Sequence, residues 1–344
     1  MFKDLSRGAV LAKAHAMHGN LLTAQDYDEL LRKRSVNEIA DYLKNSACYR
    51  DILGDINENS IHRGHLESLL RRDLYDKYTR LCHYEVSRTE SFFSYFITDA
   101  ETDQILRCIM YINAEKSEDF ITKLPGFLIE HASFDLLSLA HAHTIDELIL
   151  ALNHTPYAKI IAQVRENHKD DYTHYEIALK TYVYSNFINI VEKKSGKKQR
   201  KELLTLIKTS VELLNISTIY RCKLIFKKSD EEIRQLIIPF WCKYTQKTVD
   251  KLLEAEDESS FLKLFDSSAY GKTSEHIDFN YIKNYTERIK FALNKRILYF
   301  STNPLSVLYA FVTLCQIQIF NVTNIIEGVR YNLETKDIEK LLVK

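Results

Sequence analysis

A weak internal repetition, with a period of about 110 residues, is the feature that most constrains the fold of this 344-residue chain. Three pairs carry it, each an Asp or Asn followed fourteen positions later by Ser or Thr: Asp103 and Ser117, Asn215 and Ser229, and Asn321 and Thr335. The second pair follows the first by 112 positions, and the third follows the second by 106. A chain made of three copies of one unit usually builds a shaped surface or a ring, with no single central active site.

A tyrosine lies upstream of each pair, at the end of a segment that begins with an apolar residue and passes through Ser or Thr. These tyrosines are Tyr49, Tyr157 and Tyr270, spaced 108 and 113 positions apart. A tyrosine at the end of an apolar helix is typically an amphipathic plug whose hydroxyl finds a partner. We interpret the tyrosines, and the Asp and Asn of the pairs, as core positions that mark the repeats. Contact with a ligand is the alternative.

Turn-forming residues are scarce. Glycine and proline together make up about 3% of the chain, against roughly 12% in an average protein. In residues 20–45, 61–84 and 202–226 the apolar side chains recur every three or four positions, and no segment alternates steadily with period two. The sequence therefore predicts a nearly all-α chain of long helices.

Two short segments in which a proline comes just before an aromatic residue divide the chain into thirds. They are Pro125-Gly126-Phe127 and Pro239-Phe240-Trp241. We interpret both as domain joints, which gives helical repeats over residues 1–125, 126–240 and 241–344.

The hydroxyl residues that close the repeats have the pattern of helix N-caps. Ser117, Ser229 and Thr335 are each followed within one turn by a carboxylate, which the positive end of a helix favours. Ser229 and Glu232 also have the spacing of a capping box. The sequence predicts that each repeat ends in a short capped helix, and that the role of these residues is structural.

One stretch resembles a membrane span, because no formal charge occurs between Arg296 and Glu327. Polar residues interrupt it, however, and its continuously apolar parts are much shorter than the ~20 residues that a span requires. Asn303-Pro304 has the pattern of an N-cap followed by a first-turn proline. We predict a buried helix of a soluble protein that begins there.

No catalytic constellation is recognisable. Gly271-Lys272-Thr273 lacks the earlier glycine of a phosphate-binding loop, because Asp266 occupies that position. The histidine pairs have no third metal ligand at recognisable spacing: His15 and His18, His62 and His65, and His141 and His143. Six scattered cysteines indicate buried, reduced thiols. We predict no catalytic residue, no cofactor and no metal.

Charge gives one local signal. The chain has 47 basic and 47 acidic residues, whereas nucleic-acid-binding domains are usually strongly basic. Six basic residues nevertheless gather around Gly196: Lys193, Lys194, Lys197, Lys198, Arg200 and Lys201. This basic run is interpreted as a solvated turn between helices. The alternative is contact with anionic lipid headgroups or with an acidic partner.

Over nearly its whole length the sequence resembles the C-type subunit of V-type (A-type) ATPases, the counterpart of the d-type subunit of eukaryotic V-ATPases. The resemblance starts with the helix Ala9–Met17 and the Leu43, Ser46, Tyr49 segment. It continues through Ala140–Leu150, Tyr157 and Arg221, and ends with Asn303-Pro304-Leu305, Asn321 and Asn324–Gly328. Gln316 and Gln318 depart from it, because charged residues are expected there.

The resemblance implies three similar helical domains around a pseudo-threefold axis, forming a funnel. It implies a non-catalytic rotor subunit that couples the shaft subunits (D and F type) to the membrane proteolipid ring for H⁺ or Na⁺ transport, with no nucleic acid and no small-molecule substrate. Such a subunit is peripheral, on the cytoplasmic face of the membrane. A helical-repeat scaffold for soluble partners and an all-α enzyme with an unrecognised site are the alternatives.

Overall fold

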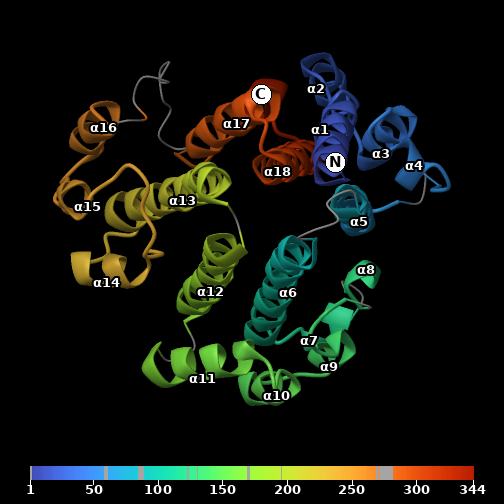
Figure 1. Ribbon diagram of the computed structural model, residues 1–344. Coiled ribbons are helices and arrows are strands. Elements are labelled where there is room, and N and C mark those ends of the chain that lie inside the picture. Colours follow the sequence, from blue (N-terminus) through green and yellow to red (C-terminus); the bar gives the residue numbers. More distant parts are fainter. Residues whose placement is uncertain are drawn as a thin grey trace. The chain divides into compact units, whose positions relative to one another are not determined.

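The computed structural model describes residues 2–57, 61–83, 89–121, 124–129, 131–168, 171–194, 196–268, 270 and 282–344. Within these ranges the regular elements are helices, and none of the residues described is in a strand (Figure 1). The prediction of an all-α chain is confirmed.

The helices follow α1 (Phe2–His18) in an order that recurs three times: short helices, then two long helices, then one short helix. The first series is α2 (Ala24–Leu31), α3 (Val36–Asn45), α4 (Arg50–Leu53), α5 (Arg63–His83), α6 (Thr89–Asn113) and α7 (Ser117–Phe120). After α8 (Gly126–Ile129), the second is α9 (Leu136–Ala140), α10 (Ile145–Ala151), α11 (Pro156–His168), α12 (Tyr172–Lys194), α13 (Lys197–Tyr220) with the π-helical turn η3 (Arg221–Ile225), and α14 (Asp230–Gln235). The third is α15 (Gln246–Leu253), α16 (Glu258–Asp266), α17 (Ile282–Phe300), α18 (Pro304–Arg330) and α19 (Thr335–Lys340).

The chain forms two compact units, and both are assembled from separate segments. Unit 1 contains residues 1–87, 201–217 and 256–344, and unit 2 contains residues 88–200 and 218–255. The division into repeats at 1–125, 126–240 and 241–344 stays a prediction.

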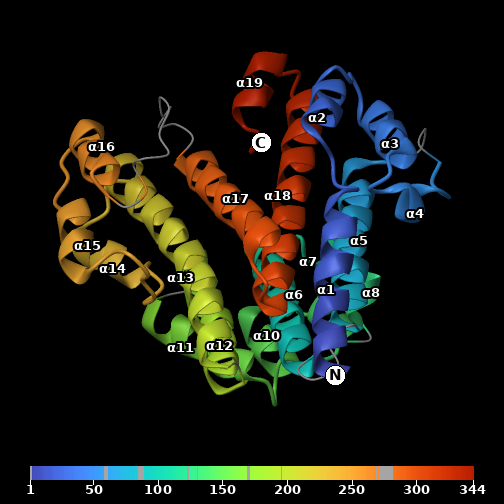
Figure 2. The ribbon, with the colours of Figure 1, turned by 45° about the horizontal axis from the view of Figure 1, so that its top comes forward.

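Unit 1 is organised around α18, which packs against α17, α1 and α5 (Figure 2). This is the uncharged stretch of the sequence, and it is the one helix among the described residues that is long and apolar enough to cross a membrane. In its most apolar window 89% of the residues are buried inside the protein. Its position is therefore that of a core helix, as predicted.

The start of α18 also agrees with the prediction. Asn303 is the N-cap, and its side chain accepts a hydrogen bond from the Leu305 N–H at 3.3 Å. Pro304 occupies the first turn, where its missing N–H costs nothing. The Asn303 amide also donates to the Ser306 hydroxyl at 2.6 Å, which fixes the cap in a buried position.

Unit 2 is organised around the pair α6 and α12, which pack against each other (Figure 1). One hydrophobic cluster joins them to the short helices α7, α9, α10 and α11. Ile105, Phe120, Leu148, Ile161 and Tyr175 are among its most buried members, with 0–1% of their surface exposed. The short helices therefore dock by their apolar faces onto the long pair.

Candidate functional site

The described residues contain no group of three or more His, Cys, Asp or Glu side chains that could hold a metal ion. His15 and His18 pack against the ring of Tyr299, with centroids 6.5 and 5.4 Å away. The rings of His62 and His65 lie 6.1 Å apart, and His141 and His143 are exposed. Gly271-Lys272-Thr273 lies outside the described residues.

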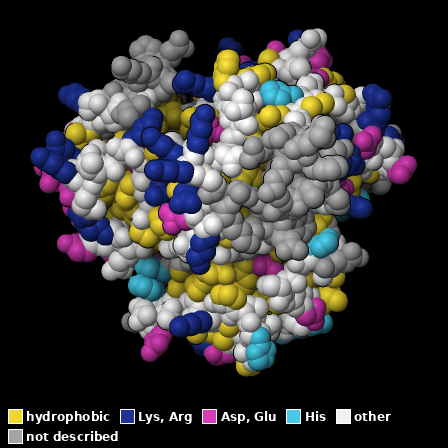
Figure 3. All heavy atoms as spheres, viewed as in Figure 1, with side chains coloured by type: hydrophobic (Ala, Val, Ile, Leu, Met, Phe, Trp, Pro, Cys, Tyr) yellow, Lys and Arg dark blue, Asp and Glu magenta, His cyan; other side chains and the backbone are white. Residues whose placement is uncertain are grey.

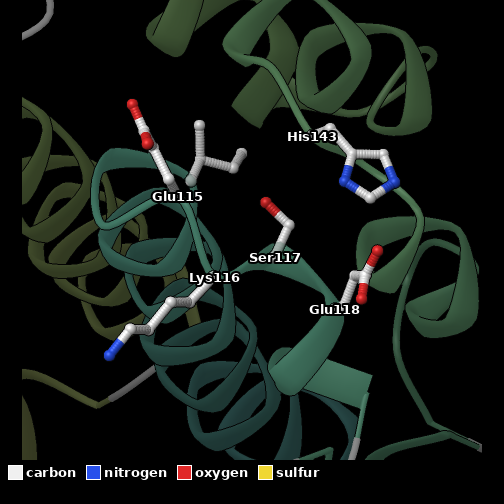
Figure 4. Close-up of a pocket in the computed structure, with 6 residues that line it drawn as sticks. Glu115, Lys116, Ser117, Glu118 and His143 are labelled. Carbon is white, nitrogen blue, oxygen red and sulfur yellow. The ribbon is translucent and has the colours of Figure 1, made fainter.

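A shallow pocket in unit 2 is lined by Ile112, Glu115, Lys116, Ser117, Glu118 and His143. Figure 4 shows the side chains of Glu118 and His143 on one side, while Lys116 points away. Its charged residues are exposed, so water screens them, and no buried group converges on a common point. The arrangement lacks the desolvated acid–base pair that enzyme sites usually have.

The three repeat tyrosines share one kind of contact. Tyr49, Tyr157 and Tyr270 are 1%, 2% and 3% exposed, so they belong to the core as predicted. Tyr157 donates its hydroxyl proton to Glu101 Oε2 at 2.6 Å, and Tyr270 donates to Glu212 Oε1 at 2.5 Å. Tyr49 Oη instead accepts from Gln318 Nε2 at 2.9 Å.

The partners of these tyrosines follow a cyclic order along the sequence. Tyr157, in the second series, bonds to α6 of the first, and Tyr270, in the third, bonds to α13 of the second. Tyr49, in the first series, bonds to α18 of the third. The long helices repeat the order, because α6 packs on α12 and α18 packs on α5. Each tyrosine thus ties its own series of helices to the preceding one.

Glu101, Glu212 and Gln318 are therefore the functional counterparts of the tyrosines, and sequence reasoning missed the first two. They are 2%, 0% and 4% exposed. Glu101 also accepts from the backbone N–H of Ser133. Burial, and then the nearby Glu101 carboxylate, raise the pKa of Tyr157, so its hydroxyl stays protonated and can donate. The available signal was a polar residue three positions before Asn215 and Asn321, inside an apolar helix.

The structure gives Gln318 a reason to differ from the two glutamates. Its Nε2 donates to Tyr49 and to Cys48 Sγ at 3.0 Å, while its Oε1 accepts from the Leu22 N–H at 2.8 Å. An amide can donate and accept at once, whereas a carboxylate can only accept. The neutral side chain therefore fits this contact. Gln316, two residues earlier, is exposed.

A lysine–carboxylate pair also recurs on the first long helix of each series. The pairs are Lys77 with Asp73 at 2.5 Å, Lys180 with Glu176 at 2.5 Å, and Lys290 with Glu287 at 2.7 Å. The Lys77 ammonium lies 5.0 Å from the centre of the Tyr49 ring. The Lys77 pair is the most buried, with side chains 12% and 13% exposed. These pairs extend the repetition beyond the residues that revealed it.

The marked Asp and Asn positions do not all belong to the core. Asn215 and Asn321 are each 1% exposed, but Asp103 is exposed, and this part of the prediction is wrong. Gln104, 6% exposed, lies three positions after Glu101, as Asn215 does after Glu212 and Asn321 after Gln318. The repeat register in α6 is therefore one residue later than predicted.

Asn321 shows what a buried amide does at this position. Its Nδ2 donates to the Val343 carbonyl at 2.7 Å, and its Oδ1 accepts from the Val343 N–H at 2.9 Å. Both polar groups of Val343 are thereby satisfied within the core. This pair holds the segment after α19 against α18.

One of the three predicted helix caps is present. Ser229 caps α14 with a full capping box: it accepts from the Glu232 N–H at 3.3 Å, and Glu232 accepts from the Ser229 N–H at 2.8 Å. Ser117 and Thr335 are instead the first residues of α7 and α19. Lys116 and Glu334 hold the N-cap positions, without a side-chain cap bond.

The physical reason for this correction lies in how the second long helices end. Each is followed by a residue in the left-handed conformation: Glu115 with φ 56°, Lys227 with φ 53° and Asn332 with φ 53°. Lys227 follows Glu212 by fifteen positions, whereas Glu115 and Asn332 follow Glu101 and Gln318 by fourteen. The extra residue of the second series coincides with the π-helical turn η3, since a π-turn holds one more residue than an α-turn. A constant fourteen-residue spacing therefore shifts the other two caps out of register.

The basic run forms the end of α12 and the start of α13. Lys193, Lys197, Lys198 and Lys201 are exposed and Arg200 is half-buried, while the side chain of Lys194 lies outside the described residues. Figure 3 shows lysine and arginine side chains gathered over this part of α13. Gly196 lies in the connection between the two helices, as expected. A role for these residues in binding headgroups or a partner stays a prediction.

Comparison with known proteins identifies an all-helical protein of an ATP synthase family. The ATP synthase (C/AC39) subunit family profile matches residues 10–341, and the chain belongs to this family. A relative from Thermococcus kodakarensis, named as the C-type subunit of an A-type ATP synthase, is 27% identical over 263 residues, 76% of this chain and 68% of that protein. A protein of the same name from Methanosphaera stadtmanae is 23% identical over 281 residues, 80% of this chain and 70% of that protein.

Proposed function

We propose that this protein is a non-catalytic central-stalk subunit of an A/V-type ATP synthase. It couples the rotating shaft subunits (D and F type) of the soluble sector to the membrane proteolipid ring, for transport of H⁺ or Na⁺. It is peripheral to the membrane, on the cytoplasmic face. The observation that carries the proposal is the family match over residues 10–341, together with relatives named as C-type subunits of A-type ATP synthases.

The internal chemistry of the chain supports this role. The repeat tyrosines, Glu101 and Glu212 are buried and bonded to one another, so they stabilise the fold and face no substrate. Torque transmission requires a body that resists deformation, and buried charge-assisted hydrogen bonds between helices provide such resistance. The most apolar helix, α18, is spent on the core and not on a membrane span.

Reconstitution tests the proposal. The purified chain is incubated separately with the solubilised proteolipid ring and with the shaft subunits, and then with both. We expect binding to each and a ternary complex that forms only when the chain is present. Interfaces that carry torque should bury on the order of 2,000 Å² or more in total, so the complexes should survive gel filtration.

Two results would count against the proposal. Failure of the chain to bind either the ring or the shaft removes its basis. ATP hydrolysis by the isolated chain would contradict a non-catalytic role. In a complete complex, omission of the chain should leave hydrolysis by the soluble sector intact and abolish the ion transport that depends on it.

A further inference from the structure

The last two turns of α17 carry an exposed stripe. Ala292, Lys295, Arg296, Tyr299 and Phe300 are spaced three and four residues apart, which places them on one face of the helix. Tyr299 is 50% exposed and Phe300 81%. The stripe therefore consists of two cations followed by two aromatic rings, with no carboxylate among them.

The stripe lies on a well-supported scaffold. The Tyr299 ring meets His18 edge to face, with centroids 5.4 Å apart. In the next residue after the rings, Ser301, the hydroxyl donates to Glu202 Oε1 at 2.6 Å. Asn303 then caps α18. The aromatic pair is thus held at the turn between two long helices and does not lie on a free loop.

The charges around this turn are mainly positive. Lys201 is exposed and adjoins Glu202, the carboxylate that is half-buried and bonded to Ser301. His18 lies close enough to Lys295 that burial, and then the lysine charge, lower the pKa of this histidine. Lys201, Lys295 and Arg296 remain as exposed cations beside the exposed rings.

We propose that this turn, formed by Lys201, Lys295, Arg296, Tyr299 and Phe300, docks on the surface of an anionic lipid bilayer. Helix faces that combine Lys and Arg with aromatic rings bind the interface of anionic membranes, where the ring enters the headgroup region and the cations meet lipid phosphates. Phe300 is the inserted ring, since it is the most exposed large apolar side chain among the described residues. The inference rests on the proposed function only for the presence of a bilayer beside the chain.

Vesicle flotation of the full chain tests this. We expect binding to vesicles of phosphatidylcholine with phosphatidylglycerol, weaker binding to phosphatidylcholine alone, and loss of binding as salt is raised. Phe300→Ala should lower the partition coefficient about tenfold, the effect of losing one buried ring. Lys295→Gln combined with Arg296→Gln should lower it about thirtyfold, at roughly 1 kcal/mol per cation.

Tyr331→Ala is the matched control. Tyr331 is 68% exposed and lies beside Arg330, 5.6 Å from its guanidinium, but at the opposite end of α18. We expect this variant to bind vesicles as the unchanged protein does. Circular dichroism of all variants should show unchanged helicity, since every altered side chain is exposed.

The outcomes separate this inference from the proposed function. Vesicle binding that Phe300→Ala does not reduce, or no binding of the unchanged protein to anionic vesicles, overturns the inference. Binding to the solubilised proteolipid ring without binding to vesicles also overturns it, and leaves the proposed function standing. Binding to vesicles but to neither ring nor shaft would have the reverse meaning.

Discussion

At the residue scale, the same tyrosine contact is made with two different kinds of partner chemistry. Glu101 and Glu212 are carboxylates that accept from Tyr157 and Tyr270, whereas Gln318 is an amide that donates to Tyr49. Hydrogen bonds to charged groups in a buried site are about twice as strong as neutral ones. The two kinds of contact should therefore differ in what they contribute to stability.

Removing the hydroxyl should show this difference. Tyr157→Phe deprives a buried carboxylate of its side-chain donor, and we expect the free energy of unfolding to fall by about 1.5–3 kcal/mol. Tyr49→Phe removes a neutral bond, and the Gln318 amide keeps its contact with Cys48, so a loss of about 0.5–1.5 kcal/mol is expected. Urea denaturation followed by circular dichroism measures both, and equal losses would contradict the distinction.

At the element scale, the short helix that ends the third series is held by close packing on α18. Gly328 has no side chain, and a Cβ at this position would clash with the side chain of Ile338 in α19. Ile338 is 2% exposed, so it has little room to move. The glycine therefore allows the close approach of the two helices.

Gly328→Ala should accordingly destabilise the protein by about 1–3 kcal/mol, through overpacking at a site that cannot relax. Gly8→Ala is the control, because a Cβ at Gly8, within α1, would meet no atom within 4 Å. There the better helix propensity of alanine should stabilise by about 0.5–1 kcal/mol. Thermal unfolding distinguishes the two, and stabilisation by Gly328→Ala would show that α19 is only loosely docked.

The ends of the long helices show how far local signals extend. The capping box at Ser229 and the N-cap at Asn303 depend on residues within one turn, and both could be predicted from the sequence. The left-handed residues Glu115 and Lys227 could not, because glycine is the usual signal for that conformation. The helix is closed there by packing, and its preferred residue is absent.

At the scale of the whole molecule, the charges of the basic run are external to the fold. Lys193, Lys197, Lys198 and Lys201 are exposed. Changing all four to glutamine should alter the free energy of unfolding by less than about 0.5 kcal/mol, as expected for surface substitutions. Arg200→Gln, at a half-buried position, should cost more. Chemical denaturation compares the two, and unfolding of the fourfold variant would show that these lysines support the structure.

The sequence by itself determined the helical class, the start and burial of α18, the capping box of α14 and the burial of the three tyrosines. Each depends on periodicity, caps or composition, which act over a few residues. Only the tertiary structure decided which residues meet across the fold, such as Tyr157 with Glu101, 56 positions apart, and Tyr49 with Gln318, 269 positions apart. It also decided that Gln104, and not Asp103, faces the core, because the orientation of a helix is set by the surfaces it packs against.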